Sequence, residues 1–376
     1  MVSGDQNGCV LSMSNETPVE AVVGGVLNLG LKKRYDPTVL IFDTPKAYSI
    51  VYKDPLVAIT RDINPEVMTV MYNNGLCEHE DYMLIEECAA VSSDDLAPEG
   101  TSIFNTSDFK TKCTNFDEFR YFLSVGELKA NLFYNCTALT SITLPGALLT
   151  IGNQAFYNCN HLTSITIPDS VTTIEGSAFS ACSSLAGSLI IPNNVTSIGN
   201  NAFTNCTGLT SITLGNSVTS IGAAAFSGCT GLTGALVIPD SVTSIRTSAF
   251  TNCNHITSIT IGNSVTTIET NAFYGCTGLT GALVIPNSIQ TFGSSAFFNC
   301  TGLTSVTLGN SVTTWGSNVF YNCTGLTSVV FNCNVPNYAL YISNNNSPFY
   351  GCTNIRNVTI GHGCTSIGQY AFRNCT

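Results

Sequence analysis

The stretch that decides the fold, residues 206–229, reads Cys-Thr-Gly-Leu-Thr-Ser-Ile-Thr-Leu-Gly-Asn-Ser-Val-Thr-Ser-Ile-Gly-Ala-Ala-Ala-Phe-Ser-Gly-Cys. In it, Ile212 and Leu214 alternate with polar residues, which is typical of a strand with one buried face. Gly-Asn-Ser at 215–217 has the composition of a turn. Phe226 supplies a large core residue near the end. The stretch therefore predicts a strand, a turn and a return segment that together form one unit.

The same pattern recurs along most of the chain. Eleven of the 17 cysteines follow one another at intervals of 23 or 24 residues, with a single interval of 29. A period between about 20 and 29 residues is typical of a leucine-rich-repeat solenoid. One unit alone buries too little apolar surface to fold, so stacked units must share a continuous core. The regularly spaced cysteines are Cys136, Cys159, Cys182, Cys206, Cys229, Cys253, Cys276, Cys300, Cys323, Cys352 and Cys375.

The units resemble a known repeat family. The pattern Cys-x-x-Leu-Thr-Ser-Ile-Thr-Ile-Pro-Asp-Ser-Val-Thr-Thr-Ile-x-x-x-Ala-Phe resembles the BspA-like leucine-rich repeats of surface proteins from mucosal bacteria and protozoa. The resemblance covers about residues 127–376, and residues 115–122 resemble the lead-in to such arrays. It implies a right-handed solenoid with a parallel β-sheet on its concave face. It also implies an adhesin at the cell surface or secreted, although no signal peptide is visible at the start of this chain.

The charge distribution indicates where the array begins. Residues 1–115 hold 8 basic and 17 acidic side chains, whereas residues 116–376 hold 5 and 7. The whole chain is acidic, with a net charge of -11, and only 10% of its residues are charged. Five basic residues cannot form the basic face that a nucleic-acid backbone requires. No apolar run approaches the ~18 residues of a membrane-spanning helix. We therefore expect neither nucleic-acid binding nor a membrane span.

We expect an α+β chain in three parts. A small acidic β-rich module occupies 1–80, a helical cap and lead-in segment occupies 81–126, and the array occupies 127–376. The array has about ten units of 23–24 residues, an irregular unit over 324–352 and an uncapped C-terminus. The strands expected in the first part are Val19–Leu31, Val39–Phe42, Tyr48–Tyr52 and Val67–Tyr72, and a short helix is expected over Tyr82–Glu87.

No residue cluster predicts catalysis, a cofactor or a metal. Intervals of 23 residues do not suit zinc, whose paired ligands lie two to four residues apart. We expect the regularly spaced thiols to point inward and to bond weakly to neighbouring backbone. The dense cluster at 77–81, Cys-Glu-His-Glu-Asp, has no second half at metal-site spacing and is interpreted as a solvated acidic segment. Nucleophile and phosphate-binding motifs are missing, so an enzyme is not expected.

The outward positions of the expected strands are the candidate binding face. They are uncharged and rich in hydroxyls, with Ile190, Val237, Val284 and Val330 as interruptions. A solenoid presents such a face as an extended binding surface. Threonine and valine are also good strand formers, so strand propensity alone is the competing explanation. The candidate residues are Ser141, Thr143, Ser164, Thr166, Ser211, Thr213, Ser258, Thr260, Ser305 and Thr307.

Two further features suggest contacts with other molecules. The interval of 29 residues inserts a loop in which Tyr338, Tyr341 and Asn345 are candidate binding residues, because such loops often bind ligands. Drift in a tolerant surface loop is the simpler explanation of the insertion, because lengthening such a loop costs little. An uncapped strand near Val358–Ile360 predicts self-association through that edge.

Three functions follow from these features. The first is a non-enzymatic protein-interaction or adhesion module that binds a protein or cell-surface ligand through the concave face. The alternative is a structural or recognition segment of a larger, phage-type assembly, anchored by the N-terminal module. Ice or crystal-surface binding by the threonine columns is a third hypothesis, which the curvature expected of such solenoids disfavours.

Overall fold

The computed structural model describes residues 2–5, 8–11, 49–50, 57–61, 64–80, 82–336 and 347–375. The chain divides into two compact units, Met1–Ala90 and Val91–Thr376. The candidate loop residues Tyr338, Tyr341 and Asn345 lie outside the described residues, as do the strands expected over Val19–Leu31 and Val39–Phe42.

The first unit combines short strands with two helices. One antiparallel sheet has the order β1 (Val2–Asp5), β2 (Gly8–Leu11) and β3 (Ser49–Ile50). Strand β4 (Val57–Thr60) pairs antiparallel with β5 (Tyr82–Leu84). Helices α1 (Pro65–Asn73) and α2 (Ile85–Ala90) complete this unit within the described residues.

Two expectations for the first unit were wrong. The segment Val67–Tyr72 is not a strand but lies in α1, which has a proline in its first turn. Its apolar residues are Val67, Met68, Val70 and Met71, and this spacing of three and four places them on one helix face. The β-branched valines favoured a strand, and burial of that face overrode their propensity. The helix expected from Tyr82 begins only at Ile85, because residues 82–84 pair with β4.

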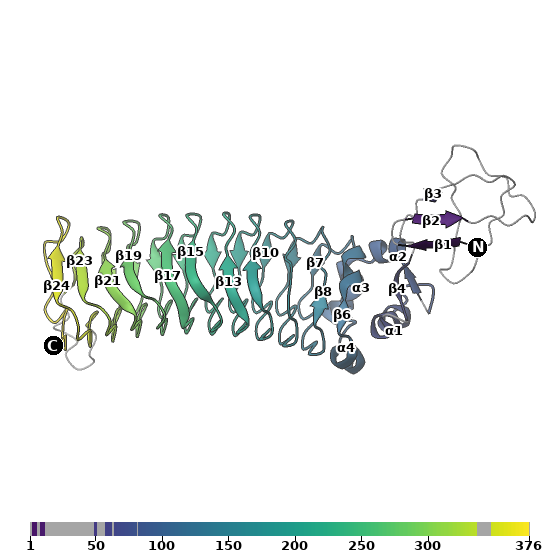
Figure 1. Ribbon diagram of the computed structural model, residues 1–376, viewed down its shortest axis with the longest axis horizontal. Coiled ribbons are helices and arrows are strands. Elements are labelled where there is room, and N and C mark those ends of the chain that lie inside the picture. Colours follow the sequence, from purple (N-terminus) through teal and green to yellow (C-terminus); the bar gives the residue numbers. More distant parts are fainter. Residues whose placement is uncertain are drawn as a thin grey trace, which may run out of the picture. The chain divides into compact units, whose positions relative to one another are not determined.

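The second unit begins with short helices at one end of the repeat array (Figure 1). They are α3 (Ser93–Leu96), η1 (Pro98–Gly100), α4 (Ser107–Lys112) and η2 (Asp117–Tyr121). Between α4 and η2, strand β6 (Asn115–Phe116) pairs parallel with β8 (Ser141–Ile142) of the first repeat. The lead-in segment thus continues the hydrogen-bonding pattern of the array.

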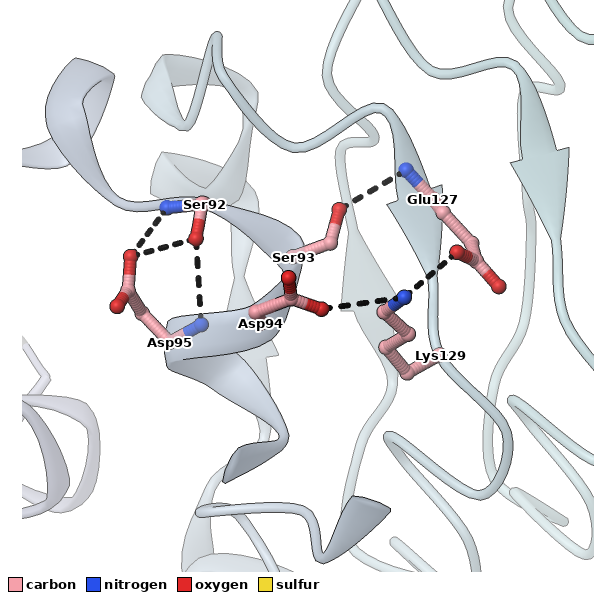
Figure 2. Close-up of polar contacts among 6 residues, drawn as sticks. All are labelled: Ser92, Ser93, Asp94, Asp95, Glu127 and Lys129. Atoms are coloured by element: carbon pink, nitrogen blue, oxygen red, sulfur yellow. Dashed lines mark hydrogen bonds and ion pairs between the residues drawn. The ribbon is translucent and has the colours of Figure 1, made fainter. Parts of the chain in front are cut away.

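Polar contacts join α3 to the first strand of the array (Figure 2). The backbone N–H of Glu127 donates to the Ser93 hydroxyl at 3.0 Å. Lys129 Nζ lies 3.2 Å from an Asp94 carboxylate oxygen and 2.9 Å from one of Glu127. Since Glu127 opens β7 (Glu127–Leu128), α3 supplies hydrogen-bond partners to a strand that would otherwise have an open edge.

The array is a parallel-strand leucine-rich-repeat solenoid, as predicted. Figure 1 shows its turns following one another in a row. Most turns contribute strands to two parallel-sheet systems. The first system is a nine-stranded sheet of two-residue strands. Its strands, in spatial order, are β7, β9 (Thr150–Ile151), β10 (Thr173–Ile174), β12 (Ser197–Ile198), β14 (Ser220–Ile221), β16 (Ser244–Ile245), β18 (Thr267–Ile268), β20 (Thr291–Phe292) and β22 (Thr314–Trp315).

The second system consists of shorter ladders with longer strands. Breaks between ladders fall where successive strands are not hydrogen-bonded in register, as between β13 and β15. The ladders are β11 (Gly187–Ile190) with β13 (Leu209–Thr213), β15 (Thr233–Ile238) with β17 (His255–Ile261), and β19 (Gly281–Val284), β21 (Leu303–Thr307), β23 (Ser328–Phe331) and β24 (Asn357–Ile360) in that order.

Aligned side chains form the core between the two systems. The phenylalanine column runs through successive turns with ring centroids 5.1 to 5.4 Å apart from Phe133 to Phe320. Phe349 continues the column at 5.2 Å from Phe320 and stacks on Phe372. The irregular turn therefore also contributes a core ring, although its insertion places Phe349 outside the regular spacing of 23–24 residues. The Sγ atoms of the cysteine column donate to carbonyls of the preceding turn, as from Cys206 to Phe179 at 3.1 Å. The predicted inward thiols are confirmed.

Candidate functional site

The second strand system presents the candidate residues in register. We call its solvent side the strand face. Ser211 pairs with Ser188 of the preceding turn and Thr213 with Ile190. The same pairing recurs two turns on, where Thr260 lies beside Val237, and again where Thr307 lies beside Val284. Repeated backbone register therefore converts a 23–24-residue period into straight columns of side chains.

Two columns define the strand face. The outer column alternates threonine with a larger aliphatic residue over most of its length, and the inner column beside it carries small residues. The outer column is Thr143, Thr166, Ile190, Thr213, Val237, Thr260, Val284, Thr307, Val330 and Thr359. The inner column is Ser141, Ser164, Ser188, Ser211, Ala235, Ser258, Ala282, Ser305, Ser328 and Asn357.

Three of the four aliphatic residues of the outer column are more than half exposed, and Val330 is half-buried. Ile190, Val237 and Val284 are 64%, 57% and 61% exposed. They were regarded above as interruptions of a hydroxyl column. The structure shows them as apolar projections at every second turn, separated by Thr213 and Thr260, which are also exposed. Neither column contains a charged side chain.

The threonines of this face divide into bonded and unbonded groups. Along the edge of the strands, Thr163 Oγ1 donates to the Thr140 carbonyl at 3.0 Å, and Thr233 donates to Thr210 at 3.2 Å. Such hydroxyls strengthen the stack. In the part of the chain that the structure describes, the outer-column residues Thr213, Thr260 and Thr307 make no side-chain hydrogen bond, and their hydroxyls are available to a partner.

The first turn differs from the others because the lead-in segment covers it. Asn115 Nδ2 donates to Ser141 Oγ at 2.6 Å, and Thr143 Oγ1 donates to an Asp117 carboxylate oxygen at 3.1 Å. Ser141 and Thr143 therefore serve the junction between the lead-in and the array. Ser164 and Thr166 lie on an exposed segment without regular strand geometry. The sequence could not separate Ser141 and Thr143 from the rest, since their partners lie outside the repeat.

The face offers no enclosed site for a small molecule. A hollow between β13, β15 and β17, lined by Ser211, Leu236 and Ile256, has a volume of only about 10 Å³. That is about enough for a single water molecule. Over the described ranges, no group of three or more histidine, cysteine or acidic side chains is close enough to hold a metal ion. The surface is therefore suited to a broad contact and not to the enclosure of a ligand.

The buried thiols are chemically quiet. Burial raises the pKa of Cys182 and of Cys229 to about 12, because the apolar core disfavours the thiolate. The thiol of Cys77 in the first unit has its pKa raised to about 11, again chiefly by burial. A thiol that stays protonated at neutral pH is neither a good nucleophile nor a metal ligand. Nor does any described helix have the length and apolarity to cross a membrane.

Comparison with known proteins places these features in context. The sequence profile of the BspA type Leucine rich repeat region matches residues 102–233, 232–347 and 341–376, in six copies. A search of the curated proteins finds no match.

One solved structure has a similar fold over about two thirds of this chain. A leucine-rich repeat protein from Bacteroides ovatus is 30% identical with a TM-score of 0.56, and the match covers 68% of this chain. This chain spans 63% of the Bacteroides protein, less than two thirds of its length. A leucine rich cell surface protein from Faecalibacterium prausnitzii is 26% identical with a TM-score of 0.34, over 66% of this chain and 82% of that chain.

Proposed function

Because the chain belongs to the BspA-type leucine-rich repeat family, we propose that it is a protein-binding module whose strand face contacts the partner. The observation that carries the proposal is the outer column, in which Ile190, Val237 and Val284 are more than half exposed. A row of exposed apolar side chains along one face of a solenoid is suited to contact with another protein.

The chemistry of the face suits another protein. The aliphatic groups supply apolar contact, and the unbonded hydroxyls of Thr213, Thr260 and Thr307 can donate or accept hydrogen bonds. A column free of charge imposes no desolvation cost for buried ions. These properties favour a neutral, extended partner surface over a charged ligand or a small molecule.

We further propose that the module acts at the cell surface or after secretion, in adhesion. The family resemblance and the cell-surface description of the Faecalibacterium protein support this location. A partner on another cell or in the surrounding matrix would then contact the strand face.

The test is a binding assay of the full chain against a panel of purified extracellular-matrix proteins. The triple variant Thr213→Lys, Thr260→Lys and Thr307→Lys places three charges on the outer column. It should not bind any matrix protein to which the wild-type chain binds. The matched control is Asn216→Lys, Asn263→Lys and Asn310→Lys, which adds the same charges to exposed turn positions three residues further along the same turns.

Circular dichroism should report an unchanged fold for both triple variants. If the wild type and the threonine triple variant bind the matrix protein equally well, the strand face is not the binding surface. Loss of binding in the asparagine variant as well would show a nonspecific effect of charge.

A further inference from the structure

The outer column has a symmetry that single residues do not reveal. Read from its centre, between Val237 and Thr260, each aliphatic residue on one side has a threonine at the same distance on the other. Val237 mirrors Thr260, Thr213 mirrors Val284, and Ile190 mirrors Thr307. The pattern continues one turn further, and only the outermost pair departs from it because both members are threonine.

This alternation is self-complementary. Consider a twofold axis that lies in the strand face, parallel to the strands and midway between β15 and β17. It reverses the order of turns in a second copy while leaving each column opposite itself. Val237 of one copy then faces Thr260 of the other, and Thr213 faces Val284. Each aliphatic side chain then contacts a threonine of the other copy, and the contact is the same seen from either copy, as an isologous interface requires.

Three other properties permit this close approach. The inner column beside the projections holds only serine and alanine from β11 to β23, as at Ala235 and Ser258. Both columns are uncharged, so two identical faces do not repel one another. Figure 1 draws the turns of the array in a nearly straight row, so the same spacing can be matched over many turns.

The contact area sets the expected strength. The first turn is covered by the lead-in segment, so it and its mirror partner are left out. Eight turns at ~4.8 Å give a length of about 38 Å, and about four strand residues give a width of about 13 Å. The resulting area is roughly 500 Å² per copy, below the ~800 Å² per partner of a typical stable interface. We therefore expect a weak dimer that forms reversibly as concentration rises.

We propose that the strand face binds a second copy of this chain in an antiparallel, face-to-face dimer. The proposal uses the same surface as the protein-binding function above and names one partner for it. It does not depend on the test against matrix proteins, because self-association is measured with no other protein present.

The experiment is sedimentation velocity of the full chain over a concentration series, with three variants at exposed positions. Wild type should shift from monomer to dimer. Val237→Thr replaces two symmetry-related Val–Thr contacts by Thr–Thr contacts and should weaken the dimer by roughly tenfold. The double variant Val237→Thr with Thr260→Val exchanges the two side chains, restores complementarity and should return the dimer to near wild-type strength.

The rescue is specific to the proposed register. A monomer at every concentration would overturn the proposal, and so would a double variant no stronger than Val237→Thr. Association could instead use the last turn, where Val358 and Ile360 are 44% and 52% exposed. Ile360→Lys tests that route: loss of the dimer in this variant, with Val237→Thr unaffected, would assign the contact to the last strand and overturn the strand-face dimer.

Discussion

The first turn of the array and its last described turn differ in how far their core residues are covered. At the first turn, Phe133 packs against rings of the lead-in segment, with Phe104 at 5.2 Å and Phe119 at 5.5 Å, and all are fully buried. At the last described strand, Val358 and Ile360 remain about half exposed. Their counterparts one turn earlier, Val329 and Phe331, have no exposure at all.

The difference shows where stability in this fold comes from. A core residue is buried by the turns on both sides and only partly by its own turn. Val329 and Val358 have the same chemistry and the same column, and only the number of neighbouring layers differs. Stability is therefore approximately a sum of turn-to-turn interfaces, as expected of a quasi-one-dimensional solenoid.

The largest effect is expected at the first turn. Phe133→Ala removes a ring that contacts the lead-in segment and the next turn, and should lower the free energy of unfolding by about 4 kcal/mol. Phe372→Ala, at the opposite end of the same column and half-buried, should cost less than half as much. Equilibrium urea unfolding measures both, and equal losses would contradict the layer account.

A matched pair of valines sharpens the comparison. Val329→Ala leaves a cavity between β21 and β24 and should cost about 2 kcal/mol. Val358→Ala removes the same atoms from a half-exposed position and should cost less than about 1 kcal/mol. The same denaturation experiment applies, and a larger loss at Val358 would mean that something covers the last turn in solution.

The reciprocal cap of α3 should have a smaller, pH-dependent effect. Ser92 N–H donates to an Asp95 carboxylate oxygen at 2.8 Å, and Asp95 N–H donates to Ser92 Oγ at 3.3 Å (Figure 2). The Ser92 hydroxyl donates to the same carboxylate oxygen at 2.7 Å. This bond first, and the bond from the Ser92 N–H second, lower the pKa of Asp95 below its ordinary value of 3.8, because both stabilise the charged carboxylate. The pKa of Asp95 is lower in the folded chain than in the unfolded chain. This stabilisation is therefore fully present above the unfolded value and is lost as pH falls through the folded value.

Ser92→Ala should therefore cost about 1 kcal/mol at neutral pH. The difference between variant and wild type should shrink in acid, once Asp95 is protonated. Urea unfolding curves of the variant and the wild type at neutral pH and in acid measure this difference. A loss of stability that does not change with pH would show that the carboxylate does not contribute.

The smallest effect is expected at Lys129. Its contacts with Asp94 and Glu127 are partly exposed, and such ion pairs contribute about 0.5 kcal/mol. Lys129→Met keeps most of the side chain and removes the charge. Thermal unfolding in low and high salt should show a small loss that salt abolishes. A loss above about 2 kcal/mol would make the ion pairs, and not the aromatic cluster, the main link at this end.

The repeat could be predicted because each unit restates the same local rules. Almost every unit shows the same strand alternation as at Ile212, the same turn residues as at 215–217 and the same spacing to Phe226. An ambiguous signal in one unit is therefore resolved by its repetition in the others. Outside the array there is no such redundancy. Val67–Tyr72 was assigned to a strand from its β-branched residues, although burial on one face makes it helical.

The candidate site could be located from the sequence but not fully interpreted. Outward positions follow from strand alternation, which placed Thr213 and Thr260 correctly on the surface. The sequence did not show that Ser141 and Thr143 bond to the lead-in segment, because that contact joins segments 26 residues apart. From the sequence, Ile190 was interpreted as an interruption of a hydroxyl column. The register between turns shows that it lies directly beside Thr213 and alternates with threonine.

The central claim is that the turns stack with their cysteine and phenylalanine columns inside. Labelling of the native full chain with a thiol reagent, with modified residues located by mass spectrometry, tests it most directly. The account predicts that Cys159, Cys206, Cys253 and Cys300, which are fully buried, stay unlabelled until the protein is unfolded. Rapid labelling of these residues in the native protein would contradict it.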